Sequence, residues 1–212
     1  MFTDPQVVRR KVERELAVFV DRIDHYRARG IWVLEYRFPE LLVAFVASKF
    51  KPYPIAPYGV LMDLSNYDVE PPSVKFVNPF TREPLMKKEI PTELKRLRVL
   101  PAPQQPTAPE HVGNPQAANV QPMGPQLQED RLLQWWTDDD YPFICLQGIR
   151  EYHENPAHTG DPWWLYRSKG AGGIIRLLEL ISKYGTEPMT QLNFQLQFIP
   201  AGIVQQQVMD PP

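Results

Sequence analysis

Apolar residues recur at spacings of three and four near the start of the chain. The stripe consists of Val8, Val12, Leu16, Phe19, Ile23 and Tyr26. Thr3 or Asp4 followed by Pro5 is typical of a helix start, and Gly30 is typical of a helix end. This pattern predicts one amphipathic helix.

Four short segments that are rich in β-branched or aromatic residues follow this helix. They cover residues 31–36, 41–48, 58–64 and 73–77, and turns containing Pro, Gly or Asn separate them. Short connections between successive strands favour antiparallel pairing. The sequence therefore predicts a four-stranded antiparallel meander and an α+β fold.

The second half of the chain changes character twice. A charged stretch and then a proline-rich stretch fill residues 81–131, and they contain too few large apolar residues to offset the entropy of folding. We therefore expect a flexible insertion there. A short apolar segment, 141–146, leads into a loop that carries Cys145, and apolar positions at helical spacing predict a second amphipathic helix over 174–184, ended by Gly185.

These elements fit a single domain over residues 1–185, interrupted by the insertion. Residues 186–212 form a Gln-rich tail, in which the alternating stretch 192–198 is typical of an added strand. The length and the 43% of apolar residues allow one sizeable core.

Charge and composition exclude several classes of function. A net charge of -2 with interspersed signs argues against nucleic-acid and anionic-membrane partners. The N-terminus lacks the pattern of a signal peptide, and no apolar run reaches the length of about 18 residues that a membrane span needs. One cysteine cannot form an internal disulfide, so we expect a reducing, cytoplasmic environment.

Three ordered motifs resemble those of ubiquitin-conjugating enzymes. The run 56–64, Tyr67 and the run 71–76 (Pro-Pro-Ser-Val-Lys-Phe) resemble that family's third and fourth strands with their Tyr-Pro-x-x-Pro-Pro-x-Val-x-Phe signature. Ile144-Cys145-Leu146 resembles its active-site motif, and Trp163 or Trp164 resembles the tryptophan that follows it. The resemblance implies a UBC-like fold with Cys145 as its thioester-forming residue.

The chain also departs from that family. Its His-Pro-Asn tripeptide is absent from the segment before the cysteine, Asp68 replaces the first proline of the strand signature, and the link to the cysteine is much longer. These differences indicate a divergent bacterial member, of the kind found beside an activating enzyme, a ubiquitin-like protein and a deconjugating metalloprotease.

The chemistry that this resemblance implies needs a thiolate nucleophile and a donor to the tetrahedral oxyanion. Cys145 is the only thiol, and the alternative is a buried core cysteine. Asn78, His153 and His158 are candidates for the donor or for a proton acceptor, and the alternative is that both histidines are loop residues without a catalytic task.

Two further groupings of residues have chemical interpretations. Asp138, Asp139 and Asp140 precede the cysteine strand and either orient an incoming lysine or form a solvated turn. Cys145, His153, His158 and Asp161 are allowed zinc ligands, but their spacing lacks the paired pattern of zinc motifs. We therefore expect no metal and no cofactor.

The sequence thus predicts an enzyme that accepts a ubiquitin-like protein from an activating enzyme on Cys145 and transfers it to an amine, chiefly a lysine, of a target protein. The resemblance assigns the long, basic first helix to the activating enzyme. The alternatives are an inactive UBC-like module that binds or scaffolds a partner, and an unrelated α+β domain.

Overall fold

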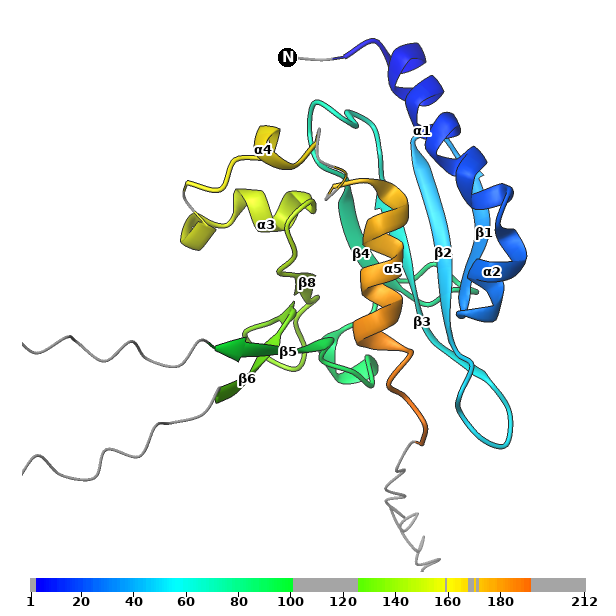
Figure 1. Ribbon diagram of the computed structural model, residues 1–212, viewed down its shortest axis with the longest axis vertical. Coiled ribbons are helices and arrows are strands. Elements are labelled where there is room, and N and C mark those ends of the chain that lie inside the picture. The colour runs from blue at the N-terminus through cyan, green and yellow to red at the C-terminus, as the bar shows by residue number, and fades with distance from the viewer. Residues whose placement is uncertain (1–2, 101–125, 159, 168–169, 171, 192–212) are drawn as a thin grey trace, which may run out of the picture.

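A four-stranded antiparallel sheet with helices packed against it forms the body of the protein (Figure 1). The computed structural model describes residues 3–100, 126–158, 160–167, 170 and 172–191. The first half of the chain contains helices α1 (Pro5–Val20) and α2 (Ile23–Ala28) and strands β1 (Ile31–Arg37), β2 (Glu40–Ala47), β3 (Ile55–Asp63) and β4 (Ser73–Val77). The strands lie in the order in which they occur in the sequence, which confirms the predicted meander and the α+β class.

The N-terminal helix begins where the sequence predicts it but is interrupted. Asp4 caps α1 by accepting a hydrogen bond from the Gln6 backbone N–H at 2.8 Å, and Pro5 occupies the first helical position. The chain leaves the helical conformation between α1 and α2, so two helices replace the single one expected. The apolar stripe remains continuous because Phe19 stacks on Tyr26 across the break, with ring centroids 4.5 Å apart.

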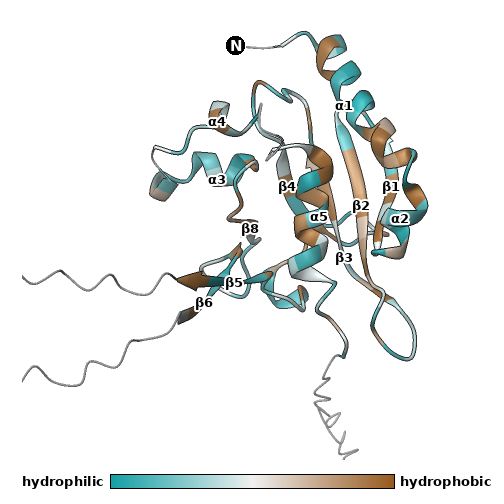
Figure 2. Ribbon diagram, in the orientation of Figure 1, coloured by the Kyte–Doolittle hydropathy of each residue, from teal (hydrophilic) through white to brown (hydrophobic). Residues whose placement is uncertain are grey.

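The core is formed by the sheet together with helices α1, α2 and α5 (Ile174–Gly185). Strand β2 is buried from residue 41 to residue 45 and is hydrophobic along most of its length (Figure 2). The α5 face that the sequence predicts is buried as well, and α5 contacts α1 and β1. Burial of both surfaces supplies the main stabilisation of this layer arrangement.

Residues 81–131, expected to form a flexible insertion, contain ordered elements. These are the 3-10 helix η1 (Lys87–Glu89) and strands β5 (Lys95–Leu100) and β6 (Gln126–Arg131), which pair as an antiparallel ribbon. Buried Ile90 and Leu94 anchor the segment to the core. Residues 101–125 of the expected insertion, and the possible strand at 192–198 in the tail, lie outside the described residues.

Short elements complete the second half of the chain. They are β7 (Leu133–Gln134), β8 (Phe143–Ile144), α3 (Arg150–Glu154), the 3-10 helix η2 (Pro156–His158) and α4 (Trp164–Arg167). In Figure 1, α3 and α4 lie beside the sheet at the β4 edge, on the side away from α1. Among the helices that the structure describes, none is long and apolar enough to cross a membrane.

Candidate active site

Cys145 follows directly after β8 and has a fixed backbone and a partly accessible side chain. Its backbone N–H donates to the Leu132 carbonyl at 2.7 Å, and its neighbours Ile144 and Leu146 are buried in the core. The side chain itself is of intermediate exposure. The thiol is therefore held in place without being enclosed.

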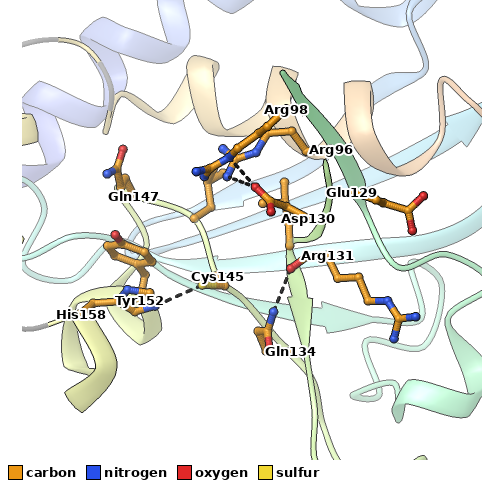
Figure 3. Close-up of a pocket in the computed structure, with 12 residues that line it drawn as sticks. Arg96, Arg98, Glu129, Asp130, Arg131, Gln134, Cys145, Gln147, Tyr152 and His158 are labelled. Carbon is orange, nitrogen blue, oxygen red and sulfur yellow. Dashed lines mark hydrogen bonds and ion pairs between the residues drawn. The ribbon is translucent and has the colours of Figure 1, made fainter. Parts of the chain in front are cut away.

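Two hollows meet at Cys145. The larger, about 540 Å³, has a charged wall that includes Arg96, Arg98 and Asp130 (Figure 3). The smaller, about 250 Å³, has an aromatic wall of Trp135, Trp136 and Phe143. Cys145 and His158 line both hollows, so the thiol is approachable from two chemically different sides.

His158 is the polar side chain closest to the thiol among the interactions that the structure describes. Its Nε2 lies 3.2 Å from the Cys145 Sγ (Figure 3). The imidazole stacks on the ring of Tyr152, with centroids 4.0 Å apart and planes 20° from parallel. A nitrogen at this distance accepts the thiol proton when the other ring nitrogen carries the hydrogen.

A hydrogen-bond network around Asp161 holds Tyr152 under His158. Both Tyr152 and Tyr166 donate their hydroxyl protons to the Asp161 carboxylate, and Gln147 Nε2 donates to it at 3.1 Å. These donors hold the pKa of Asp161 below its ordinary value. Burial and the bond to Asp161 raise the pKa of Tyr152 to about 12, so the phenol stays protonated and remains a donor.

His153 has a structural role in the same loop. Its Nε2 accepts a hydrogen bond from the Gly148 backbone N–H at 3.2 Å, and its Nδ1 lies 2.8 Å from the Asp161 carbonyl oxygen. Accepting at one nitrogen and donating at the other fits the neutral imidazole. Both ring nitrogens are occupied away from Sγ, so of the two candidate histidines only His158 contacts Cys145.

Asn78 is placed in the turn after β4 and not at the thiol. Its side-chain carbonyl accepts hydrogen bonds from the backbone N–H groups of Phe80 and Thr81, at 2.9 and 3.2 Å. It lines neither hollow at Cys145 in the described part of the chain. The side chain is used to form a local turn, which is a common role of asparagine.

The three aspartates at 138–140 form a turn as well. The Asp140 carboxylate accepts hydrogen bonds from the Trp136 and Thr137 backbone N–H groups, which lower its pKa. Asp139 pairs with Lys88 at 2.6 Å and is exposed. This geometry favours the solvated-turn interpretation over a role at the thiol.

The residues considered for zinc are engaged in other interactions. His153 is bound to backbone groups at both nitrogens, and the Asp161 carboxylate accepts from three side chains. Within the described residues, no group of three or more His, Cys, Asp or Glu side chains is arranged to hold a metal ion.

An arginine pair on β5 was not among the site residues expected from the sequence. Arg96 and Arg98 are two positions apart, so their side chains lie on the same face of the strand. Both pair with the Asp130 carboxylate on β6, Arg96 at 3.2 Å. The alternating pattern of residues 95–100 was a signal for this strand, but its partner lies beyond the proline-rich segment. The ribbon brings these charges to the wall of the larger hollow.

The environment of the thiol combines opposing effects on its pKa. Burial raises the pKa of Cys145, the positive charge of Arg98 opposes this, and the negative charge of Asp130 adds to it. The net result is a pKa above the ordinary value. The resting thiol is therefore neutral at pH 7, and its reaction requires a proton acceptor.

A second pair of residues ties the site to the sheet. The backbone N–H of Arg150 donates to the Pro72 carbonyl at 2.9 Å, and Arg150 Nη1 pairs with Asp63 at 3.2 Å. The carboxylate of Glu151 accepts from the Ser73 hydroxyl and from the Val74 N–H. These contacts fix α3, and hence the loop after Cys145, against the ends of β3 and β4.

The chain belongs to the Y4jH-like family, whose model, described as the Y4jH family, matches residues 3–189. It is 40% identical over 201 residues to the uncharacterized protein y4jH of Sinorhizobium fredii (strain NBRC 101917 / NGR234). That alignment covers 95% of this chain and 93% of the relative. The matched region includes the sheet, Cys145 and α5.

Proposed function

We propose that this member of the Y4jH-like family is an acyltransferase of the ubiquitin-conjugating type, which carries a ubiquitin-like protein as a thioester on Cys145. The contact of 3.2 Å between Cys145 Sγ and His158 Nε2 is the observation on which the proposal rests. A core cysteine needs no such partner, whereas a neutral nucleophilic thiol does.

The arrangement of elements supports the same proposal. A first helix, a four-stranded meander, a cysteine on a loop beyond the fourth strand and a helix packed on the sheet match the order of elements in ubiquitin-conjugating enzymes. Trp163, which follows the cysteine as in that family, is buried, and its Nε1 donates to the Asp68 carbonyl at 2.9 Å. We infer a UBC-like fold from this order and from the sequence motifs together.

The proposed reaction has two acyl transfers. In the first, His158 Nε2 takes the thiol proton, Sγ attacks the thioester carbonyl of the loaded activating enzyme, and the carbon–sulfur bond to that enzyme breaks as its thiolate leaves. In the second, a neutral lysine amine of the target attacks the Cys145 thioester. The carbon–nitrogen bond forms, the bond to Sγ breaks, and the amine proton passes to the base or to water.

The two hollows suit these two transfers because they give the thiol separate approaches. The acyl donor occupies one side of Sγ while the incoming amine comes from the other. The exposed basic residues of α1, such as Arg10 and Arg14, provide the surface for an acidic face of the activating enzyme. A single free thiol fits a reducing compartment, so we place the reaction in the cytoplasm.

The alternative is a UBC-like module that binds partners without chemistry, and the raised pKa of Cys145 favours it. The two proposals differ in what they predict for the thiol. A carrier forms an adduct that depends on Cys145, whereas a binding module binds its partners equally well when Cys145 is replaced.

The test incubates the full chain with ATP and each pair of activating enzyme and ubiquitin-like protein encoded in the source genome. Non-reducing gels and intact mass then detect the adduct. We expect a thiol-sensitive adduct with wild type, a thiol-resistant oxyester with Cys145→Ser, an amide with Cys145→Lys and no adduct with Cys145→Ala. The proposal would be overturned if the activating enzymes form their own thioesters with the ubiquitin-like proteins but none of them transfers its ubiquitin-like protein to the wild-type chain.

A further inference from the structure

The named candidates for an oxyanion donor and the neutral side-chain donors of the larger hollow are engaged in other hydrogen bonds. Asn78 and His153 are bound to backbone groups, as described above, and His158 faces the sulfur. In the larger hollow, Gln134 Nε2 donates to the Arg131 carbonyl at 2.8 Å, and Gln147 Nε2 donates to Asp161 and Tyr166. The Tyr152 hydroxyl donates to Asp161.

Three backbone N–H groups next to the thiol are also in use. Cys145 N–H donates to Leu132, Leu146 N–H to Ile144 and Gly148 N–H to His153. An oxyanion that forms on a carbonyl carbon bound to Sγ therefore finds these donors occupied. The arginines on β5 are different because each guanidinium has five N–H donors and they share one carboxylate.

The charges of the larger hollow leave this arginine pair incompletely neutralised. Its wall holds three arginines and two carboxylates, which gives a net charge of 3 − 2 = +1. Glu129 pairs with Lys95 at 2.9 Å and Arg131 pairs with Glu93 at 3.2 Å, so both are neutralised elsewhere. Arg96 and Arg98 thus face Asp130 alone, and the Arg96 Nε is buried without a hydrogen-bond partner among the described residues.

Of the two arginines, Arg98 is the one available to a reacting group. Its side chain is 55% exposed, against 26% for Arg96. In Figure 3 both arginine side chains are drawn above Cys145 with Asp130 beside them, and all four residues line the larger hollow. The ion pairs of Arg96 and Arg98 with Asp130 thus hold Arg98 at the wall of the hollow.

Given the proposed thioester chemistry, we propose that Arg98 is a catalytic residue that donates to the oxyanion of the tetrahedral intermediate, in place of the asparagine found in ubiquitin-conjugating enzymes. Arg96 and Asp130 act as positioning residues. A preorganised cation that faces developing negative charge lowers the barrier of both acyl transfers.

The electrostatics of the thiol agree with this assignment. The charge of Arg98 acts on the Cys145 thiol and lowers its pKa against the effect of burial. A cation close enough to favour negative charge on Sγ also favours negative charge on the carbonyl oxygen that is bonded to the attacked carbon.

The experiment compares wild type with Arg98→Gln, Arg98→Lys and Arg176→Gln in the assay with an activating enzyme. Arg176 is the matched control because it is an exposed arginine on α5, outside the residues that line the hollow. We expect Arg98→Gln to slow charging and discharge to free lysine by about 10²–10³-fold at saturating donor. Arg98→Lys should be intermediate, and Arg176→Gln should match wild type.

A second readout is the pH profile of Cys145 alkylation by iodoacetamide, which needs no partner protein. Its midpoint should rise in Arg98→Gln and stay at the wild-type position in Arg176→Gln. A higher KM for the donor with an unchanged saturating rate would mean that Arg98 binds a fixed carboxylate of the donor. That result would overturn the oxyanion assignment, as would wild-type charging and discharge rates in Arg98→Gln.

The failures of the two proposals are distinguishable. If wild type itself forms no adduct, the thioester carrier proposal fails. If wild type is charged and Arg98→Gln is charged and discharged at the same rates, only the role of Arg98 fails.

Discussion

The Sγ of Cys145 lies 3.2 Å from Nε2 of His158, whose imidazole is stacked on Tyr152. The two residues are thirteen positions apart, and the loop, α3 and η2 between them fold back to bring them together. The stack limits rotation of the ring, and the Asp161 network fixes Tyr152 in turn. The geometry therefore provides a thiol with a base in a defined position.

Replacing His158 should slow charging of the thiol without unfolding the protein. In His158→Ala the neutral thiol loses its proton acceptor, so we expect the rate of adduct formation at pH 7 to fall by about 10²-fold or more. The measurement is single-turnover charging by a loaded activating enzyme. His25→Ala is the control, because His25 is exposed on α2, and it should keep the wild-type rate. Equal rates in His158→Ala and wild type would exclude His158 as the base.

The pH dependence of Cys145 should reflect its burial. Because burial raises the pKa of the thiol above its ordinary value of 9.0, the midpoint of alkylation by iodoacetamide should lie above pH 9.0 in the folded protein. The folded state then binds the thiol proton more tightly than the unfolded state. The contribution of this group to stability is therefore complete below pH 9 and is lost as the pH rises through the higher, folded pKa.

Comparison with Cys145→Ala isolates this contribution to stability. Urea unfolding should show that the variant loses less stability than wild type as the pH rises above 9. An alkylation midpoint below 9.0 would show that positive charge outweighs burial at the thiol.

Tyr152 should act on the thiol through His158. Tyr152→Ala removes the stacked ring and should slow charging by about 10-fold to 10²-fold, because a small misplacement of the base lowers the rate of proton transfer from the thiol. Tyr152→Phe keeps the ring and loses only the donor to Asp161, so a smaller effect is expected. Tyr166→Phe is the matched control, since it also removes a donor to Asp161 but leaves the ring under His158 intact. If all three variants charge at one rate, the stack does not position the base.

The sequence was sufficient to predict the elements whose signal is local. Short segments rich in β-branched and aromatic residues, separated by turn residues, predicted the four strands of the meander. A period-3.6 pattern predicted α5, and Asp4-Pro5 predicted the start of α1. These patterns reflect burial of one face, and burial is what the structure shows at positions such as Val43 and Leu177.

Features that depend on distant partners were not predictable in this way. Strand β5 pairs with β6 across the proline-rich segment, and its alternation of arginine and apolar residues lacks a local partner. Composition alone therefore suggested a flexible insertion. At the site, Cys145 and His158 could be named from their residue types, but the turn-forming role of Asn78 and the backbone contacts of His153 depend on geometry that the sequence does not contain.

The contact between Tyr58 and Gly185 joins the sheet to the end of α5 and gives a test of the core. Tyr58 is fully buried between Phe45 and Phe76, and its hydroxyl has no hydrogen-bond partner in the described part of the chain. A Cβ on Gly185 would lie 1.9 Å from that hydroxyl oxygen and 3.1 Å from Cζ. Removing the hydroxyl would therefore relieve most of the clash.

Three variants test this contact by urea unfolding. Gly185→Ala should lower the free energy of unfolding by about 1–3 kcal/mol, because an overpacked core cannot relax. Tyr58→Phe should leave it unchanged or raise it by about 1 kcal/mol, since an unsatisfied buried hydroxyl is lost. In the Tyr58→Phe background, Gly185→Ala should lower the free energy of unfolding by a clearly smaller amount. Arg176→Ala, exposed on the same helix, controls for helix effects. If Gly185→Ala lowers the free energy of unfolding equally in both backgrounds, the hydroxyl does not limit the packing of α5. The end of the helix then shifts to make room for the added methyl group.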